Sequence, residues 1–221
     1  MEQSKFKLII FDFDGTLGDT RRNIVTTMQM TIAEHQLAYR TEDECASVIG
    51  LPLAGCFSTL FPDIQEELIN QYAETYRRIF NENMQKIQPQ AFPGVVDTLA
   101  KLHQMGYVLT IASSRSHNSL IELTHQMGIA DFISMLLGAN DVKEAKPQPE
   151  PVLKMLEAMH YDASETLVVG DMDVDMLMGV RAGTRTCGVT YGNGCREKLA
   201  AAGADYIIDD FAELLILLSE R

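Results

Sequence analysis

Residues 7–16 of the chain read KLIIFDFDGT, and residues 166–175 read TLVVGDMDVD. In each stretch a short apolar run leads into a segment that contains glycine and aspartate. A run that is apolar throughout is typical of a strand buried on both faces of a parallel sheet. The polar residues after each run then lie at the carboxyl edge of that sheet, which is where open α/β sheets bind their ligands.

Four aspartates follow the two runs: Asp12 and Asp14 after the first, Asp171 and Asp175 after the second. Residues two apart at a strand end project the same way, and residues four apart in a helix share a face. Carboxylates brought to one edge repel one another and lose hydration, and a hard divalent cation offsets this cost. The pattern therefore predicts a catalytic Mg²⁺ site.

The composition indicates a globular protein with room for one domain and an insertion. The chain has 221 residues, 46% of them apolar, which suffices for a full hydrophobic core. Its net charge of −13 disfavours binding to nucleic acid or to an anionic membrane through bulk electrostatics. Small anionic substrates must therefore be captured by local groups.

The N-terminal segment and the cysteines favour a cytoplasmic protein. Only a handful of apolar residues precede Asp12, too few for the core of a signal peptide or for a membrane span. Cys45, Cys56, Cys187 and Cys195 show no CxxC spacing, so we expect free thiols in a reducing compartment.

The pattern of apolar residues changes along the chain. Residues 20–85 show helical spacing, interrupted at 50–52 (GLP) and at 61–63 (FPD). From residue 92 onward helix and strand patterns alternate, which is typical of a doubly wound parallel sheet. We expect strands at 108–112, 133–137, 166–169, 186–189 and 206–208, and helices at 95–105, 119–127, 151–159, 174–182, 196–202 and 211–218.

These patterns predict an α/β fold, with a doubly wound parallel, Rossmann-like sheet core and an inserted all-helical cap. The core is expected to take residues 1–18 and 88–221, and the cap residues 19–87. Linkers near Gly18 and at 88–93 would join them, and paired linkers are places where a lid can hinge.

Two further polar groups lie at chemically useful positions. Ser113 and Ser114 follow the expected strand at 108–112, where a hydroxyl and free N–H groups can hold phosphate oxygens, although such a pair is also a common helix cap. Lys146 precedes Pro147, a pair that alone is usual in a solvent-facing loop.

In this order the pieces resemble the haloacid dehalogenase superfamily of phosphohydrolases. The matching motifs are DFDGT at 12–16, the serine after a hydrophobic strand, the lysine of AKPQPEP at 145–151, and GDMDVD at 170–175. The segments FPGVVDTLAKLHQMGY at 92–107 and VIGLPL at 48–53 are similar to the phosphoglycolate-phosphatase-like branch, which has a helical cap. The resemblance covers nearly the whole chain.

The resemblance implies a phosphatase that forms an aspartyl-phosphate. Asp12 would be the nucleophile, and Asp14 would act as acid and then as base. Mg²⁺ would be held by Asp12, the Asp14 backbone carbonyl and Asp171, with Asp175 as a further ligand or a partner of the ligands. Met172 stands where relatives often have a hydroxyl residue, which removes one hydrogen-bonding group near these ligands.

The resemblance also implies how the substrate, a small phosphorylated metabolite, is held. Ser113 and the Ser114 backbone N–H would bind phosphoryl oxygens, and Lys146 would neutralise charge on Asp12 and on the transferring group. Gly18 departs from the larger apolar residue that relatives often have at the first linker.

Other functions remain open at this point. A dehalogenase needs neither the second carboxylate nor a metal, so Asp14 argues against it. A phosphomutase of the β-phosphoglucomutase kind needs a second phosphate site in the cap, for which Arg77 or Arg78 could serve. A non-catalytic binding module on the same fold is the least favoured reading. The substrate (phosphoglycolate, a sugar phosphate, a nucleotide or pyrophosphate) and the choice between monomer and homodimer are not fixed by the sequence.

Overall fold

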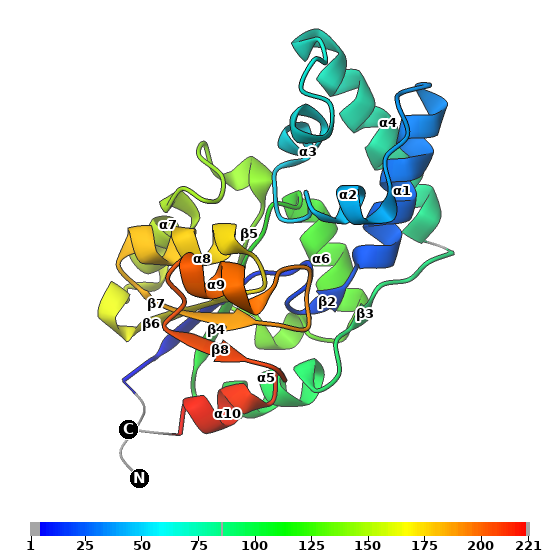
Figure 1. Cartoon of the computed structure of the whole chain (residues 1–221). Helices are drawn as coiled ribbons and strands as arrows, with labels where there is room; N and C mark the ends of the chain where they lie inside the picture. The colour runs from blue at the N-terminus through cyan, green and yellow to red at the C-terminus, as the bar shows by residue number, and fades with distance from the viewer. Residues whose placement is uncertain (1–4, 85, 220–221) are drawn as a thin grey trace.

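The computed structural model describes residues 5–84 and 86–219. Figure 1 shows a parallel sheet flanked by helices and, apart from it, a group of helices formed by an early part of the chain. We call the first the sheet unit and the second, residues 21–84, the helical unit.

The sheet consists of six parallel strands in the order β5-β4-β1-β6-β7-β8. The strands are β1 (Leu8–Phe11), β4 (Val108–Ala112), β5 (Met135–Leu137), β6 (Thr166–Gly170), β7 (Arg185–Val189) and β8 (Tyr206–Ile208). The chain builds outward from β1 to β5 on one side and then from β6 to β8 on the other. The strand order therefore reverses at β1, which confirms the predicted doubly wound α/β sheet.

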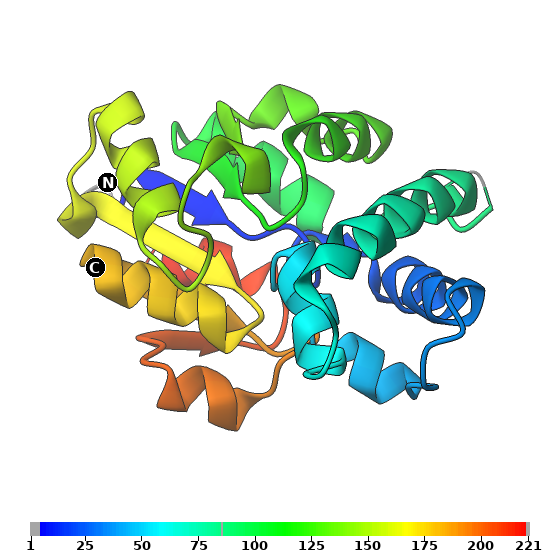
Figure 2. The ribbon, with the colours of Figure 1, turned by 90° about the horizontal axis from the view of Figure 1, so that it is seen from above.

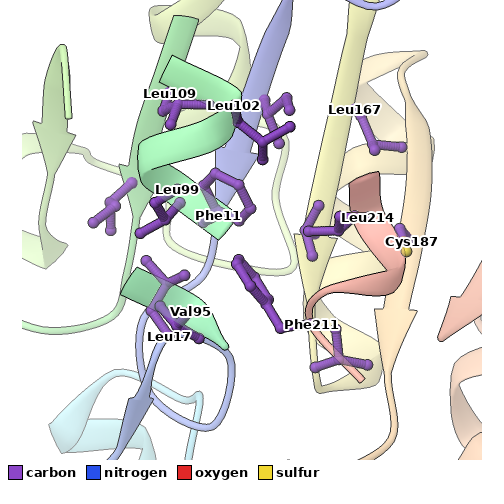
Figure 3. Close-up of a cluster of buried hydrophobic side chains, with 14 of the residues drawn as sticks. Phe11, Leu17, Val95, Leu99, Leu102, Leu109, Leu167, Cys187, Phe211 and Leu214 are labelled. Atoms are coloured by element: carbon purple, nitrogen blue, oxygen red, sulfur yellow. The ribbon is translucent and has the colours of Figure 1, made fainter. Parts of the chain in front are cut away.

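Helices cover both faces of this sheet. They are α5 (Val95–Gln104), α6 (His117–Gln126), α7 (Glu150–Met159), α8 (Asp173–Ala182), α9 (Arg196–Ala201) and α10 (Glu213–Leu217). Alternate residues of β1 point to opposite faces. Ile9 and Phe11 pack in one core with residues of α5, α6 and α10, whereas Leu8 and Ile10 pack in a second core with residues of α7 and α8. Figure 3 shows side chains of β1, α5 and α10 meeting in the first core.

The helical unit has a hydrophobic core of its own, which includes Met28, Phe57 and Tyr72. It consists of α1 (Arg21–Glu34), α2 (Glu42–Ala46), α3 (Leu53–Leu60) and α4 (Glu66–Met84). Figure 2 shows α1 and α4 lying side by side. The breaks predicted at 50–52 and 61–63 separate α2 from α3 and α3 from α4.

One further break, at residues 35–41, was not predicted. Gln36 has a φ of +53°, and Thr41 begins α2 with a reciprocal cap, in which its hydroxyl accepts from the Glu44 N–H and the Glu44 carboxylate accepts from the Thr41 N–H. The signal was present in the sequence as Thr-x-x-Glu, which is a typical helix start.

The other differences from the expected elements lie at their ends. The strand expected at 133–137 begins at Met135, and the helix expected at 211–218 spans Glu213–Leu217. The Asp210 carboxylate accepts a hydrogen bond from the Ala212 N–H just before that helix. No helix in residues 5–84 or 86–219 combines the length and the apolar character of a membrane span.

A short antiparallel ribbon connects the two units. β2 (Gly18–Asp19) pairs with β3 (Gln90–Ala91), with Gly18 opposite Ala91. A Cβ at position 18 would lie 3.0 Å from the Met127 side chain, so glycine allows close packing at this linker. The outgoing and returning segments are thus hydrogen-bonded neighbours.

The first core, which contains Phe11, allows a prediction of how much stability a large cavity would cost. Phe211→Ala should lower the free energy of unfolding by about 3–5 kcal/mol, because this buried ring lies 5.6 Å from the Phe11 ring and its removal leaves an unfilled space. Ile216→Ala, at a position 60% exposed on α10, is the matched control and should change stability by less than about 0.5 kcal/mol. Urea unfolding of both variants measures the difference, and equal losses would contradict the assignment of this core.

Candidate active site

The carboxyl ends of β1 and β6 bring three aspartates together. Phe11 pairs with Val169, so Asp12 and Asp171 leave neighbouring strands at the same edge, and Asp175 follows in the first turn of α8. One carboxylate oxygen from each of these aspartates lies within 4.8 Å of the other two, and all three residues are buried. We call this group the carboxylate cluster.

Asp171 is fixed by two loops. Its Oδ1 accepts a hydrogen bond from Thr16 Oγ1 at 3.2 Å, and its Oδ2 accepts from the Asn193 backbone N–H at 2.7 Å. Gly15 has a φ of +89° and approaches so closely that a Cβ there would lie 2.1 Å from Asp171 Oδ2. The DFDGT motif therefore needs its glycine for space as well as for the turn. Asn193 lay outside every motif in the sequence and was not anticipated.

Lys146 supplies the positive charge of the site. Its Nζ donates to Asp12 Oδ1 at 2.5 Å and to Asp175 Oδ1 at 2.7 Å, and its side chain is only 2% exposed. The other oxygen of Asp175 accepts from the Met172 backbone N–H at 3.0 Å. The amide of Met172 thus orients Asp175, and the hydroxyl missing from its side chain is not needed for that bond.

Burial governs protonation in this cluster. Burial raises the pKa of Asp12 well above its usual range, the Lys146 ammonium opposes the rise, and the neighbouring carboxylates add to it. Burial, with the charge of Asp175, raises the pKa of Asp171 to about 7. Burial by itself would lower the pKa of Lys146, but the charges of Asp12 and Asp175 outweigh it, so that pKa is raised.

This set of donors suits a hard divalent cation. Three carboxylates and one ammonium leave excess negative charge in a buried volume, and oxygen ligands are the ones that such cations prefer. The residues that would hold the cation are Asp12, Asp171 and Asp175. The proposed contact through the Asp14 backbone carbonyl stays a prediction.

The Asp14 side chain belongs to a different group of contacts. Its carboxylate accepts from Arg115 Nε at 2.8 and 2.7 Å and from Thr20 Oγ1 at 2.5 Å. The Arg115 and Asp14 side chains are 10% and 11% exposed. The sequence predicts no role for Arg115, because an arginine after two serines is not a specific motif. Only the fold shows that this arginine contacts Asp14.

The two serines directly follow β4, beside the first residues after β1. Ser113 is buried, and its Oγ accepts from the Arg115 backbone N–H at 3.2 Å. Ser114 Oγ donates to the Gly50 carbonyl of the helical unit at 2.6 Å. The Ser114 hydroxyl therefore joins the two units, which is a use that the sequence did not suggest. Phosphate binding by Ser113 and by the Ser114 N–H stays a prediction.

A cavity of about 420 Å³ lies between the helical unit and the sheet unit. Its walls come from α1, the segment 48–52, α3, α4, the loop at 114–116 and residues 139–140. Asp14, Ser114 and Arg115 line it, whereas the carboxylate cluster and Lys146 do not. Asp14 therefore lies between this cavity and the rest of the site.

Comparisons with known proteins agree with this arrangement. A family model described as haloacid dehalogenase-like hydrolase matches residues 9–189. The chain is 34% identical to "Probable phosphatase IndB" of Dickeya dadantii, over 94% of this chain and 91% of that protein. It is 31% identical to a phosphoglycolate phosphatase of Vibrio vulnificus, over 97% of both chains. A crystal structure of a haloacid dehalogenase-like hydrolase from Bacteroides fragilis superimposes with a TM-score of 0.90 at 27% identity, over 95% of this chain and 99% of that one.

The raised pKa of Asp171 predicts that metal binding stabilises the protein more at higher pH. A folded-state pKa near 7 for Asp171 means that, without metal, this group contributes stability at low pH and loses it as the pH rises from about 4 towards 7. A cation binds the ionised form, so the gain in Tm from added Mg²⁺ should grow between about pH 5 and pH 8. Thermal unfolding in Mg²⁺ and in EDTA measures this gain. A Tm gain from Mg²⁺ that does not change with pH, or that changes with pH in the same way in the Asp171→Asn variant, would contradict this prediction.

The contacts of Lys146 predict a stability loss that metal reverses. Lys146→Met removes the ammonium from Asp12 and Asp175 and should lower the free energy of unfolding by about 3 kcal/mol in EDTA, with part of the loss restored by Mg²⁺. Arg21→Met, which breaks an exposed pair with Asp43, is the control and should cost less than about 1 kcal/mol. Urea unfolding in Mg²⁺ and in EDTA tests this prediction. A loss of stability that Mg²⁺ leaves unchanged would contradict the view that Lys146 and a metal ion offset the same carboxylate charge.

Proposed function

We propose that this chain, which belongs to the haloacid dehalogenase-like hydrolase family, is a Mg²⁺-dependent phosphatase that hydrolyses a small phosphomonoester through an aspartyl-phosphate on Asp12. The observation that carries the proposal is the position of Asp12 at the carboxyl end of the central strand. Its carboxylate contacts Lys146 and lies within the cluster completed by Asp171 and Asp175.

The first chemical step transfers the phosphoryl group to the protein. One oxygen of Asp12 attacks phosphorus, a new P–O bond forms, and the bond from phosphorus to the alcohol oxygen breaks. Lys146 donates to Asp12 and reduces the repulsion between this carboxylate and the approaching dianion. Ser113 and the Ser114 N–H bind the phosphoryl oxygens from the adjacent strand end.

Asp14 moves the protons. As an acid it protonates the leaving alkoxide, and as a base it then takes a proton from the water that attacks the aspartyl-phosphate, so that phosphate and free Asp12 are released. Its place in the cavity wall puts it on the side where the alcohol would lie. Arg115 and Thr20 hold Asp14 in this structure, so its proton transfer requires that these contacts rearrange.

Magnesium is the cation we propose for the cluster. Asp12, Asp171 and Asp175 would hold it together with the Asp14 backbone carbonyl, and it would offset the negative charge that the nucleophile and the phosphate bring together. The absence of histidine and cysteine from the cluster favours Mg²⁺ over softer metals.

The helical unit is proposed to act as a cap over the site, with the core formed by residues 1–18 and 88–221 and the cap by residues 19–87. The connecting ribbon, the cavity between the units and the Ser114 to Gly50 bond support this role. A compact cap that closes would exclude water and select a small substrate. The protein is expected to be cytoplasmic and a monomer or homodimer.

Hydrolysis is favoured over a phosphomutase reaction. A mutase needs a second phosphate site in the cap, and Arg78 is paired with Glu34 and Glu82 on an exposed face. Arg77 is the one arginine that the helical unit contributes to the lining of the cavity. Because Arg77 is exposed, its charge is screened, and this single residue makes a weak site for a second phosphate.

The nucleophile is tested by substitution. Asp12→Asn should lower Mg²⁺-dependent phosphate release from p-nitrophenyl phosphate by about 10³-fold or more, because the amide cannot form the acyl phosphate. Asp97→Asn, at an exposed position on α5, is the control and should retain activity. Rapid quenching with mass spectrometry should locate the phosphoryl adduct on Asp12 in the wild-type protein. An adduct on another residue, or full activity of Asp12→Asn, would overturn the proposal.

A further inference from the structure

The guanidinium of Arg115 has an unmatched donor. Within residues 5–84 and 86–219, its Nη2 is the buried side-chain polar atom that has no hydrogen-bond partner. Nη2 lies 2.6 Å from Asp14 Oδ1 in an ion pair, but its N–H groups are not aligned on that oxygen. A buried donor without an aligned acceptor is available to an acceptor that is not part of the chain.

This donor lies in the wall of the cavity between the two units. The Arg115 side chain is only 10% exposed, and its guanidinium lies 4.8 Å from the centre of the Phe80 ring. Asp14, the residue proposed to protonate the leaving alcohol, lines the same cavity. An alcohol bonded to phosphorus at Asp12 would therefore extend past Asp14 and towards Arg115.

The size and character of the cavity limit what that alcohol is. A volume of about 420 Å³ is far larger than glycolate or a second phosphate requires, since a water molecule takes about 30 Å³. Most of the lining is apolar and includes the following side chains of the helical unit: Ile24, Met28, Leu51, Leu53, Tyr76 and Phe80. Such walls gain from contact with flat or apolar surface, and a small, highly charged group would leave them wet or empty.

Arg115 offers the cavity a hydrogen-bond donor. Its Nη2 lies in the ion pair with Asp14 but has no aligned acceptor. Arg77, the other cation of the lining, is exposed to solvent and so contributes a screened charge. An acceptor oxygen on the alcohol is the group that Arg115 Nη2 would bind.

We infer that the substrate is a phosphomonoester of a nucleoside-sized alcohol with a flat or apolar body and an acceptor oxygen that binds Arg115 Nη2. A nucleoside and a phenol with a carbonyl substituent both meet this description. Phosphoglycolate and pyrophosphate do not meet it, because each has a leaving group too small to fill the apolar cavity. This inference rests on the proposed phosphatase function.

The size requirement is tested by filling the cavity. Wild-type kcat/KM in Mg²⁺ should be at least about ten-fold higher for uridine or adenosine 5′-monophosphate, or for 4-acetylphenyl phosphate, than for phosphoglycolate or pyrophosphate. Ala54 is an exposed residue of α3 that lines the cavity, so Ala54→Trp should fill it with little effect on folding and reduce this ratio about ten-fold. Ala33→Trp, at an exposed position on α1 away from the cavity, is the control and should keep the wild-type ratio. A wild-type preference for the small anions, or a ratio unchanged by Ala54→Trp, would overturn the inference.

The acceptor requirement is tested at Arg115. Arg115→Lys keeps a cation beside Asp14 but removes the planar fork, so all rates should fall. The kcat/KM ratio of 4-acetylphenyl phosphate to 4-ethylphenyl phosphate should also fall by about ten-fold relative to the wild type, because only the first compound has the acceptor oxygen. Intrinsic leaving-group reactivity cancels in this comparison between proteins. An unchanged ratio would exclude the proposed bond.

A binding experiment separates this inference from the proposed function. Calorimetric titration of Asp12→Asn with uridine 5′-monophosphate and with phosphoglycolate needs no turnover. At least about ten-fold tighter binding of the nucleotide, lost in the double variant with Ala54→Trp, would support the inference even if the wild-type protein released no phosphate. Equal or weaker binding of the nucleotide would overturn it even if the phosphatase activity were found.

Discussion

Three carboxylates and one ammonium are buried together at one edge of the sheet, and their balance of charge constrains the rest of the site. Asp12, Asp171 and Asp175 would repel one another at this separation, and Lys146 compensates for only part of that charge. Burial, reinforced by this remaining negative charge, raises the pKa of Asp12 and of Asp171. A site built in this way gives up stability in its empty state in return for affinity for a divalent ion.

The sheet topology explains why residues so distant in sequence meet here. β1 lies between β4 and β6, so the segments that follow these three strands begin at one edge. Asp12, Ser113 and Asp171 each come from one of these segments. β1 itself is buried on both faces, and that burial fixes the direction in which its last residues leave the sheet. The positions of these proposed site residues therefore depend on packing beneath the site as well as on their own contacts.

The sequence was sufficient for the fold and for the residues that have a distinctive local pattern. The apolar runs before Asp12 and Asp171 predicted both strands. Asp171 and Asp175 lie close together as their spacing predicted, but Asp171 precedes α8 and does not share a helix face with Asp175. The pairing of Arg115 with Asp14, the bond from Asn193 to Asp171 and the contact of Ser114 with Gly50 were not foreseen. These contacts join loops whose separation in space depends on how whole elements pack, and no local periodicity encodes that packing. The capping residues Thr41 and Glu44 indicated the break at 35–41. The helical spacing of apolar residues on either side nevertheless predicted a continuous helix there.

The ribbon formed by β2 and β3 has a consequence for protein engineering. Because the chain leaves the sheet unit at Gly18 and returns at Ala91, which is its direct pairing partner, the two junctions of the helical unit are adjacent in space. A foreign segment with similarly close ends could replace the whole insert through two neighbouring splice points, without altering the backbone of the six-stranded scaffold. The ribbon thus separates the unit to which we assign the chemistry from the unit to which we assign selectivity.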